Sequence, residues 1–362
     1  MKTLLHVKTS TSRAGCWFLQ SGIQEETGGV ARYFQVDKGR NARISTEITG
    51  YAVSALLYFR ERLGEPSYLD AADRAGRFLI RDAWDTELQS FPFEHAADLR
   101  QRYTYFFDCG IIVRGLVHLW RATGDTDFLT IARSAGLSMQ HDFASEELFH
   151  PILTLPEKHP VDRTSQWSRQ PGCYQLKSAM AWRDLFDATG EQQFLDWYEA
   201  ALQQSIAVKD IFLPAMEGPE KTMDRLHAYA YFLEGVLPAA DRTECRRVLA
   251  EGIQRVSGYL REIAPIFVRS DVYAQLLRLR LFAAQLAGIP LNTNDAAEEA
   301  ANIESFQYTG AEQRLAGGYC FGQRQGALLP FANPVSTAFC AQALDLWAQY
   351  RSGQPIDRQI LI

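Results

Sequence analysis

Acidic side chains stand at the start of several predicted helices. Glu47 follows a Ser-Thr pair where a long apolar segment begins, and Asp108 has the same place in the next such segment. A carboxylate in the first turn of a helix has a structural explanation, because the helix dipole favours negative charge there. Its chemical explanation is general acid and base catalysis, in which one carboxyl donates a proton and a second orients water or substrate. Asp224 and Asp271 are further candidates for either role.

The segments that lead into these helices are long and rich in aromatic, arginine and glycine residues. Long loops on one face of a rigid scaffold are where binding sites are usually built. Aromatic rings stack on the apolar faces of sugars, while amide, carboxylate and guanidinium groups bind hydroxyls. The predicted substrate-binding residues are Tyr51, Glu94, Trp167, Arg169, Tyr174, Lys177, Arg225, His227, Tyr231, Arg269, Tyr319 and Asn333.

Each of these residues also has an ordinary structural explanation. Trp167 and Tyr319 are plausible packing aromatics, and a single His227 on a helix is more often hydrogen-bonded or packed than catalytic. Lys177 and the arginines suit an anionic sugar, but they equally suit a role as counter-charges for the carboxylates. The argument for a saccharide site rests on the clustering of these residue types at helix starts.

A repeated helical hairpin must position these residues. Apolar residues recur at helical spacing through nearly every long segment, and strand-like alternation is almost absent. Gly64, Gly124 and Gly190 each precede three polar or turn residues, an aromatic residue and a leucine, and they recur roughly every 60 residues. Each pattern predicts a helix C-cap, a tight turn and a returning helix.

Extending this period over the chain predicts twelve helices, of which the first is an opening helix at about residues 11–27, with six inner helices that alternate with six outer ones. The inner helices are expected to begin near Glu47, Asp108, residues 174–177, Asp224, Asp271 and Asn333. An open superhelical stack is the alternative, but the last helix is too apolar for an exposed end. We therefore expect an all-α fold, a closed (α/α)6 barrel of twelve helices, as a single domain over residues 1–362.

Composition excludes several classes of protein. The net charge of −6 and the absence of a basic stripe argue against nucleic acid as a partner. No apolar run is long enough to span a membrane and no signal-peptide core is present, so we expect a cytoplasmic protein. The six cysteines form no C-x-x-C pair and the seven histidines no H-x-x-x-H pair, so we expect no metal and no cofactor. The oligomeric state is open.

Residues 106–129, FFDCGIIVRGLVHLWRATGDTDFL, resemble a segment of the unsaturated glucuronyl and rhamnogalacturonyl hydrolases. There an aspartate opens an inner helix and a Thr-Gly-Asp turn closes it. These enzymes belong to the six-hairpin glycosidase superfamily, which also contains the N-acylglucosamine 2-epimerases. The resemblance implies that Asp108 is the general acid and base and that Glu47 replaces a second acid, which is an aspartate, typically preceded by histidine, in the family.

The leading hypothesis is a glycoside hydrolase that acts on a glycosidic or unsaturated-uronyl linkage of a saccharide. A sugar epimerase or polysaccharide lyase is the second hypothesis, in which His227 or Tyr231 moves a proton and Arg225 or Arg269 steadies the developing charge. A non-catalytic toroid that binds a glycan is the third. The sequence leaves the sugar and the linkage undetermined.

Overall fold

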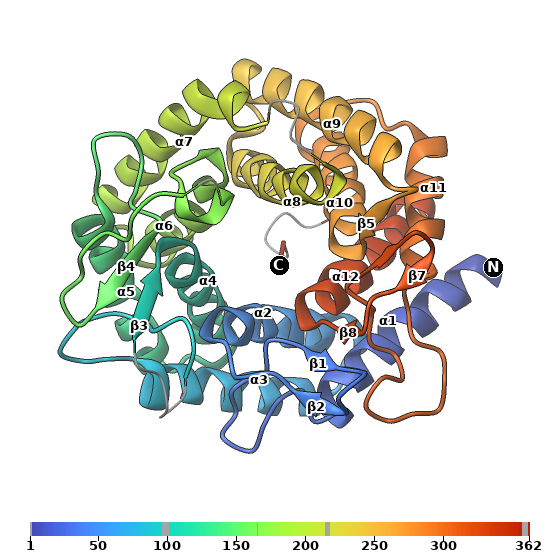
Figure 1. Cartoon of the computed structure of the whole chain (residues 1–362), viewed down its shortest axis with the longest axis horizontal. Coiled ribbons are helices and arrows are strands. Elements are labelled where there is room, and N and C mark those ends of the chain that lie inside the picture. The colour runs from blue at the N-terminus through green and yellow to red at the C-terminus, as the bar shows by residue number, and fades with distance from the viewer. Residues whose placement is uncertain (1, 96–100, 165, 214–217, 357–360) are drawn as a thin grey trace.

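The computed structural model describes residues 2–95, 101–164, 166–213, 218–356 and 361–362. Within this part of the chain, twelve α-helices form two concentric rings (Figure 1). The inner helices are α2 (Thr46–Leu63), α4 (Phe106–Thr123), α6 (Leu176–Thr189), α8 (Pro219–Val236), α10 (Ser270–Ala287) and α12 (Pro334–Arg351). The outer helices are α1 (Lys2–Gln20), α3 (Pro66–Phe78), α5 (Thr126–Phe143), α7 (Gln192–Phe212), α9 (Thr243–Ile263) and α11 (Thr293–Glu304).

The inner ring is closed, because α12 packs against both α10 and α2. The predicted (α/α)6 barrel of twelve helices is thereby confirmed. Two predicted boundaries are wrong. The opening helix α1 spans Lys2–Gln20, not residues 11–27, and packs against α12. Helix α8 begins at Pro219, so Asp224 lies inside the helix and is not its N-cap.

Local capping explains where the inner helices begin and end. The Ser45 hydroxyl accepts a hydrogen bond from the Ile48 amide at 3.3 Å, which caps α2. Gly64, Gly124 and Gly190 follow α2, α4 and α6 with φ of 80°, 74° and 73°. This left-handed conformation favours glycine, so these residues end the helices as predicted.

Glycines also let neighbouring inner helices approach closely. A Cβ on Gly110 of α4 would lie 2.5 Å from the backbone oxygen of Ser178 in α6. A Cβ on Gly50 of α2 would lie 2.9 Å from Cα of Ile112 in α4. Any larger side chain would push these helices apart, so the width of the inner ring depends on both positions.

Short strands that the sequence did not predict lie in the loops that enter the inner helices. They are β1 (Phe34–Gln35), β2 (Arg40–Asn41), β3 (Arg102–Tyr105), β4 (Ile152–Leu155), β5 (Phe267–Arg269), β6 (Gly322–Arg324), β7 (Ala327–Leu328) and β8 (Phe331–Ala332). They pair antiparallel in three small sheets, ordered β2-β1-β8, β3-β4 and β5-β6-β7. They are too short to show the alternation that sequence analysis relies on.

Two of these strands run directly into inner helices. Tyr105 ends β3, pairs with Ile152 and precedes α4. Arg269 ends β5, pairs with Gly322 and precedes α10. The sheets therefore fix the direction in which the chain enters both helices.

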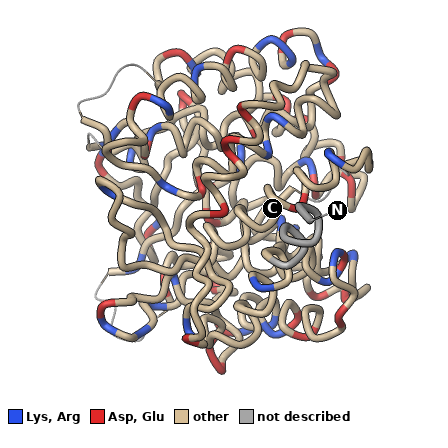
Figure 2. Tube along the Cα trace, turned by 90° about the vertical axis from the view of Figure 1, so that its right-hand side faces the viewer, with Lys and Arg blue, Asp and Glu red and all other residues tan. Residues whose placement is uncertain are grey.

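Charged residues of both signs are interspersed along the trace in a side view (Figure 2). A search of the described helices finds none with the length and apolar character that a membrane span requires.

Candidate active site

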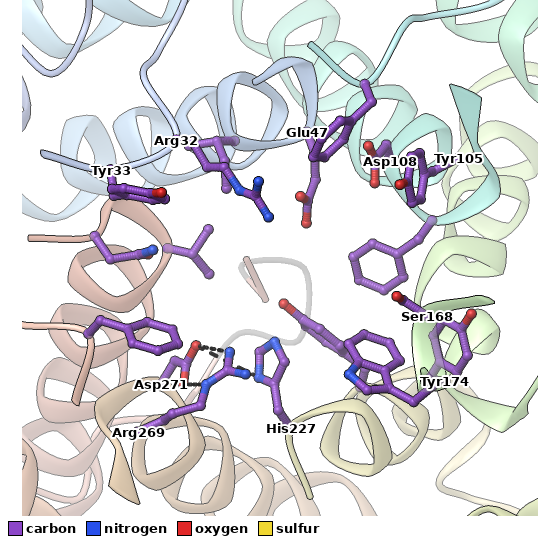
Figure 3. Close-up of a pocket in the computed structure, with 18 of the residues that line it drawn as sticks. Arg32, Tyr33, Glu47, Tyr105, Asp108, Ser168, Tyr174, His227, Arg269 and Asp271 are labelled. Carbon is purple, nitrogen blue, oxygen red and sulfur yellow. Dashed lines mark hydrogen bonds and ion pairs between the residues drawn. The ribbon is translucent and has the colours of Figure 1, made fainter. Parts of the chain in front are cut away.

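A cavity of about 450 Å³ opens at the end of the ring where the chain enters the inner helices. Side chains from several inner helices and from the entering loops point into it (Figure 3). Nine of the predicted site residues line this cavity: Glu47, Asp108, Trp167, Tyr174, His227, Tyr231, Arg269, Asp271 and Asn333.

Seven predicted site residues do not line the cavity: Tyr51, Glu94, Arg169, Lys177, Asp224, Arg225 and Tyr319. Tyr51 and Tyr319 are buried in the core, and Lys177 is fully buried and ion-paired with Glu234 at 2.9 Å. Lys177 therefore lies inside the ring and not at the mouth where the sequence placed it.

The other four lie outside the cavity lining. Asp224 pairs with Arg269 at 2.9 Å, and about half of its side chain (47%) is exposed. Glu94 pairs with Arg43 at 3.4 Å. Arg225 stacks on the ring of Phe212 and donates to its backbone oxygen at 3.1 Å. Arg169 is half-buried in a short 3-10 turn.

Several lining residues were missed by sequence reasoning, and Arg32 is the most important of them. Its guanidinium group points into the cavity beside Glu47 (Figure 3) and lies 5.1 Å from the ring centre of Phe93. Within the described residues it forms no ion pair. Its place in an arginine-rich entering loop was a signal that could have found it. Tyr33, Phe93, Tyr105, Phe107, Gln166, Ser168, Gln175, Phe321 and Phe331 also line the cavity.

Glu47 and Asp108 are the two carboxyl groups of the cavity that no arginine clamps. Asp108 is 4% exposed, and its Oδ2 has no hydrogen-bond partner in the described part of the chain. Burial and then the nearby charge of Glu47 raise the pKa of Asp108 well above its usual range. Burial raises the pKa of Glu47 to about 7, although the charge of Arg32 acts in the opposite direction. Both carboxyl groups therefore hold a proton more tightly than an exposed carboxyl group does.

Asp271 has the opposite electrostatic character. Arg269 binds both of its carboxylate oxygens, with Nε to Oδ1 at 3.0 Å and Nη2 to Oδ2 at 2.7 Å. The Arg269 charge holds the pKa of Asp271 below its usual value in spite of burial. Asp224 accepts a hydrogen bond from Nη1 of the same guanidinium group. The lowered pKa keeps Asp271 ionised, so Asp271 serves as an ion-pair partner of Arg269.

His227 is held as a neutral ring of one tautomer. Its Nδ1 lies 2.8 Å from Oε1 of Gln275, and an amide oxygen only accepts, so the proton is on Nδ1. Burial lowers the pKa of His227 to about 4, with the charge of Arg269 as a second cause. The Nε2 atom is therefore an unprotonated acceptor. The imidazole ring packs edge-on against the Tyr231 ring, with 4.4 Å between the ring centres.

No group of three or more His, Cys, Asp or Glu side chains with the geometry of a metal site occurs among the described residues. The arrangement offers two carboxyl groups with raised pKa values, a neutral histidine and an arginine that no described carboxylate pairs with, surrounded by aromatic rings. This set supports proton transfer to or from a bound polar substrate.

Comparison with solved structures identifies the class of fold. A sugar epimerase from a ruminal bacterium has 13% identity and a TM-score of 0.70, over 94% of this chain and 98% of that one. Cellobiose 2-epimerase from Spirochaeta thermophila DSM 6192 has 15% identity and a TM-score of 0.71, over 97% and 99%. An unsaturated glucuronyl hydrolase specific for heparin has 12% identity and a TM-score of 0.68, over 96% and 98%.

The chain thus has the (α/α)6 toroid fold that these solved structures share, which is the fold that the resemblance of residues 106–129 implied. No protein-family model matches the sequence, and neither does any curated protein.

Proposed function

We propose that this protein is a saccharide-active enzyme in which Asp108 is the general acid and Glu47 the second carboxyl group. The observation that carries the proposal is the unpartnered Oδ2 of Asp108, in a carboxyl group that lines the cavity and has a raised pKa. A buried carboxyl group that has a raised pKa and lacks an internal hydrogen-bond partner is suited to give its proton to a ligand. The same fold in epimerases and a glucuronyl hydrolase supports a sugar as that ligand.

The reaction that fits this pair is hydrolysis of a glycosidic linkage or hydration of an unsaturated-uronyl group. Asp108 donates its proton to the leaving oxygen of a glycoside, or to a carbon of the double bond. Glu47, in its ionised form, orients the attacking water and accepts its proton. The partly exposed rings of Trp167 and Tyr105 on the cavity wall offer flat faces for the sugar, and Tyr174 packs behind Trp167.

Arg32 supports an anionic saccharide. It points into the cavity beside Glu47 (Figure 3), and Arg269 is already neutralised by Asp271 and Asp224. A carboxylate on the substrate would give Arg32 a charged partner, in a bidentate contact that a neutral sugar lacks.

A second candidate is a sugar epimerase or isomerase that depends on His227. The observation in its favour is the fixed tautomer, because Gln275 holds the Nδ1 proton and leaves Nε2 as a base. Epimerases and a mannose isomerase with this fold also support it. In this version Asp108 is peripheral.

The two candidates are separated by product analysis on a panel of neutral, uronic and unsaturated-uronyl saccharides. We expect the wild type to form product with at least one of them, Asp108→Asn to lose turnover, and His227→Ala to retain most of it. Loss of turnover in His227→Ala with retention in Asp108→Asn would establish the epimerase version. Saccharide binding without any product would indicate a non-catalytic binding protein.

A further inference from the structure

A charged cluster is buried in the middle of the inner ring, beneath the cavity. Lys177 of α6, Glu234 of α8 and Arg278 of α10 are each 0% exposed. Glu234 pairs with both cations, at 2.9 Å from Lys177 Nζ and in a short contact with Arg278. One acid serves two bases here, and burial lowers the pKa of Lys177 to about 7. Buried donors of this kind are costly unless further acceptors surround them.

Gln342 supplies one such acceptor, since its Oε1 accepts from Arg278 Nη1 at 2.9 Å, and Leu361 and Ile362 supply others. The backbone oxygen of Ile362 accepts from Lys177 Nζ at 2.9 Å and from Arg278 Nη1 at 3.4 Å. The oxygen of Leu361 accepts from Arg114 Nη2 at 3.0 Å. Both residues are almost completely buried, and Figure 1 shows this end of the chain in the centre of the ring.

Leu361 lies on the side of the ring opposite the cavity. Leu361 borders a space of about 550 Å³ that is lined by Arg60, Gly64 and Arg121, at the C-terminal ends of α2 and α4. The cavity with Glu47 and Asp108 lies at the N-terminal starts of the same helices. Leu361 and Ile362 therefore close the ring from the far side.

Aromatic rings connect this cluster to the cavity. The guanidinium of Arg278 lies 3.8 Å from the ring centre of Phe339. The Phe339 ring packs edge-on against Tyr51 at 5.4 Å and Tyr231 at 6.3 Å. Tyr231 lines the cavity, and the charge of Glu47 acts on both tyrosines. A displacement of Arg278 would therefore be transmitted through Phe339 to Tyr231, in the cavity wall next to Glu47.

We propose that Leu361 and Ile362 are positioning residues, which hold Lys177 and Arg278 and thereby fix the Phe339, Tyr51 and Tyr231 layer under Glu47. This inference rests on the proposed function for its kinetic consequence and on the structure alone for its physical one. The proposed positioning does not extend to residues at the rim of the cavity, such as Trp167 and Arg32.

The test compares the full chain with a variant that lacks Leu361 and Ile362. We expect kcat to fall roughly 10- to 100-fold, because small misplacements of reacting groups have effects of this size. KM should change little, since the rim residues keep their places. A loss confined to thermal stability, with kcat unchanged in the folded variant, would overturn the positioning role.

A second variant keeps the test decisive if the deletion folds poorly. Lys177→Met leaves Glu234 and Arg278 as a neutral pair, so the same deletion in this background should lower Tm by much less than in the wild type. Equal losses of Tm in both backgrounds would contradict the proposed contact between Ile362 and the cations.

Hydrogen exchange separates this inference from the proposed function. In the deletion variant we expect faster exchange at residues 227–234 and 337–342 and unchanged exchange in α9 and α11, whether or not any substrate is turned over. Unchanged exchange at the first two segments would refute the inference even for an active enzyme. Faster exchange without turnover of any saccharide by the wild type would refute only the proposed function.

Discussion

Glu47 and Asp108 stand in the first turns of the neighbouring inner helices α2 and α4 and line the same cavity. Burial raises the pKa of both carboxyl groups, the charge of Glu47 raises that of Asp108 further, and Arg32 acts against the shift in both. Since Asp271 is clamped by Arg269, proton chemistry in this cavity is expected to depend on the Glu47 and Asp108 pair.

Asp108→Asn is expected to lower kcat by about 10²- to 10⁴-fold, because it removes the proposed general acid. The same change should raise Tm at pH 8. The raised pKa of Asp108 means that its contribution to stability is present at low pH and is lost as pH rises past the pKa of the unfolded chain towards that of the folded one. Asparagine does not ionise, so the variant does not lose this part of its free energy of unfolding.

Thermal unfolding at pH 4 is the control for Asp108→Asn, since the carboxyl group is then mostly protonated in the folded protein and the difference in Tm should shrink. A lower Tm for the variant at pH 8 would contradict the electrostatic account.

The pH profile of kcat should have an alkaline limb, because activity ends when the carboxyl pair loses the proton that Asp108 donates. In Glu47→Gln this limb should move to lower pH, since the charge of Glu47 no longer raises the pKa of Asp108. Residual activity measured between pH 5 and 9 tests this. A limb that stays in place would mean that the two carboxyls do not interact.

Arg32→Gln is expected to raise KM for a carboxylated saccharide at least about tenfold, because the charge of the bidentate contact is lost, and to leave KM for the neutral analogue nearly unchanged. Arg247→Gln is the matched control, because Arg247 is exposed on the outer helix α9 and pairs only with Glu251 in the described contacts. Equal effects of Arg32→Gln on both sugars would argue against an anionic substrate.

Gly110→Ala should destabilise the protein by about 1–3 kcal/mol, because its Cβ would meet the backbone of α6 and force the inner helices apart. Gly258→Ala is the opposite case. Gly258 is exposed on α9 with nothing within 4 Å of a new Cβ, so alanine should stabilise by roughly 0.5–1 kcal/mol. Urea unfolding of both variants measures the difference, and a stable Gly110→Ala would show that the ring tolerates expansion.

Much of the fold could be predicted from local pattern. Gly64, Gly124 and Gly190 end helices because a left-handed C-cap favours glycine wherever the chain goes next, and Ser45 caps α2 through its own neighbour Ile48. The start of α8 was predicted wrongly because an aspartate resembles an N-cap, whereas Pro219 begins the helix five residues earlier.

Only part of the candidate site could be predicted, because a sequence shows which charged residues are near a helix start but not which of them form ion pairs. From the sequence, Asp224, Asp271 and Arg269 are three separate candidate site residues near helix starts. In the folded chain, Arg269 forms ion pairs with both aspartates. Lys177 looks like a rim residue, but its side chain lies within the ring against Glu234 and Ile362.

The sequence by itself determined the helices, their caps and the acids at their starts, since helical spacing and capping depend on residues a few positions apart. The tertiary structure decided which acids remain unpaired, that Arg32 lies beside Glu47, and what closes the far side of the ring. Those outcomes depend on ring closure and on short strands, which bring together segments that are hundreds of residues apart, as Arg114 and Leu361 are.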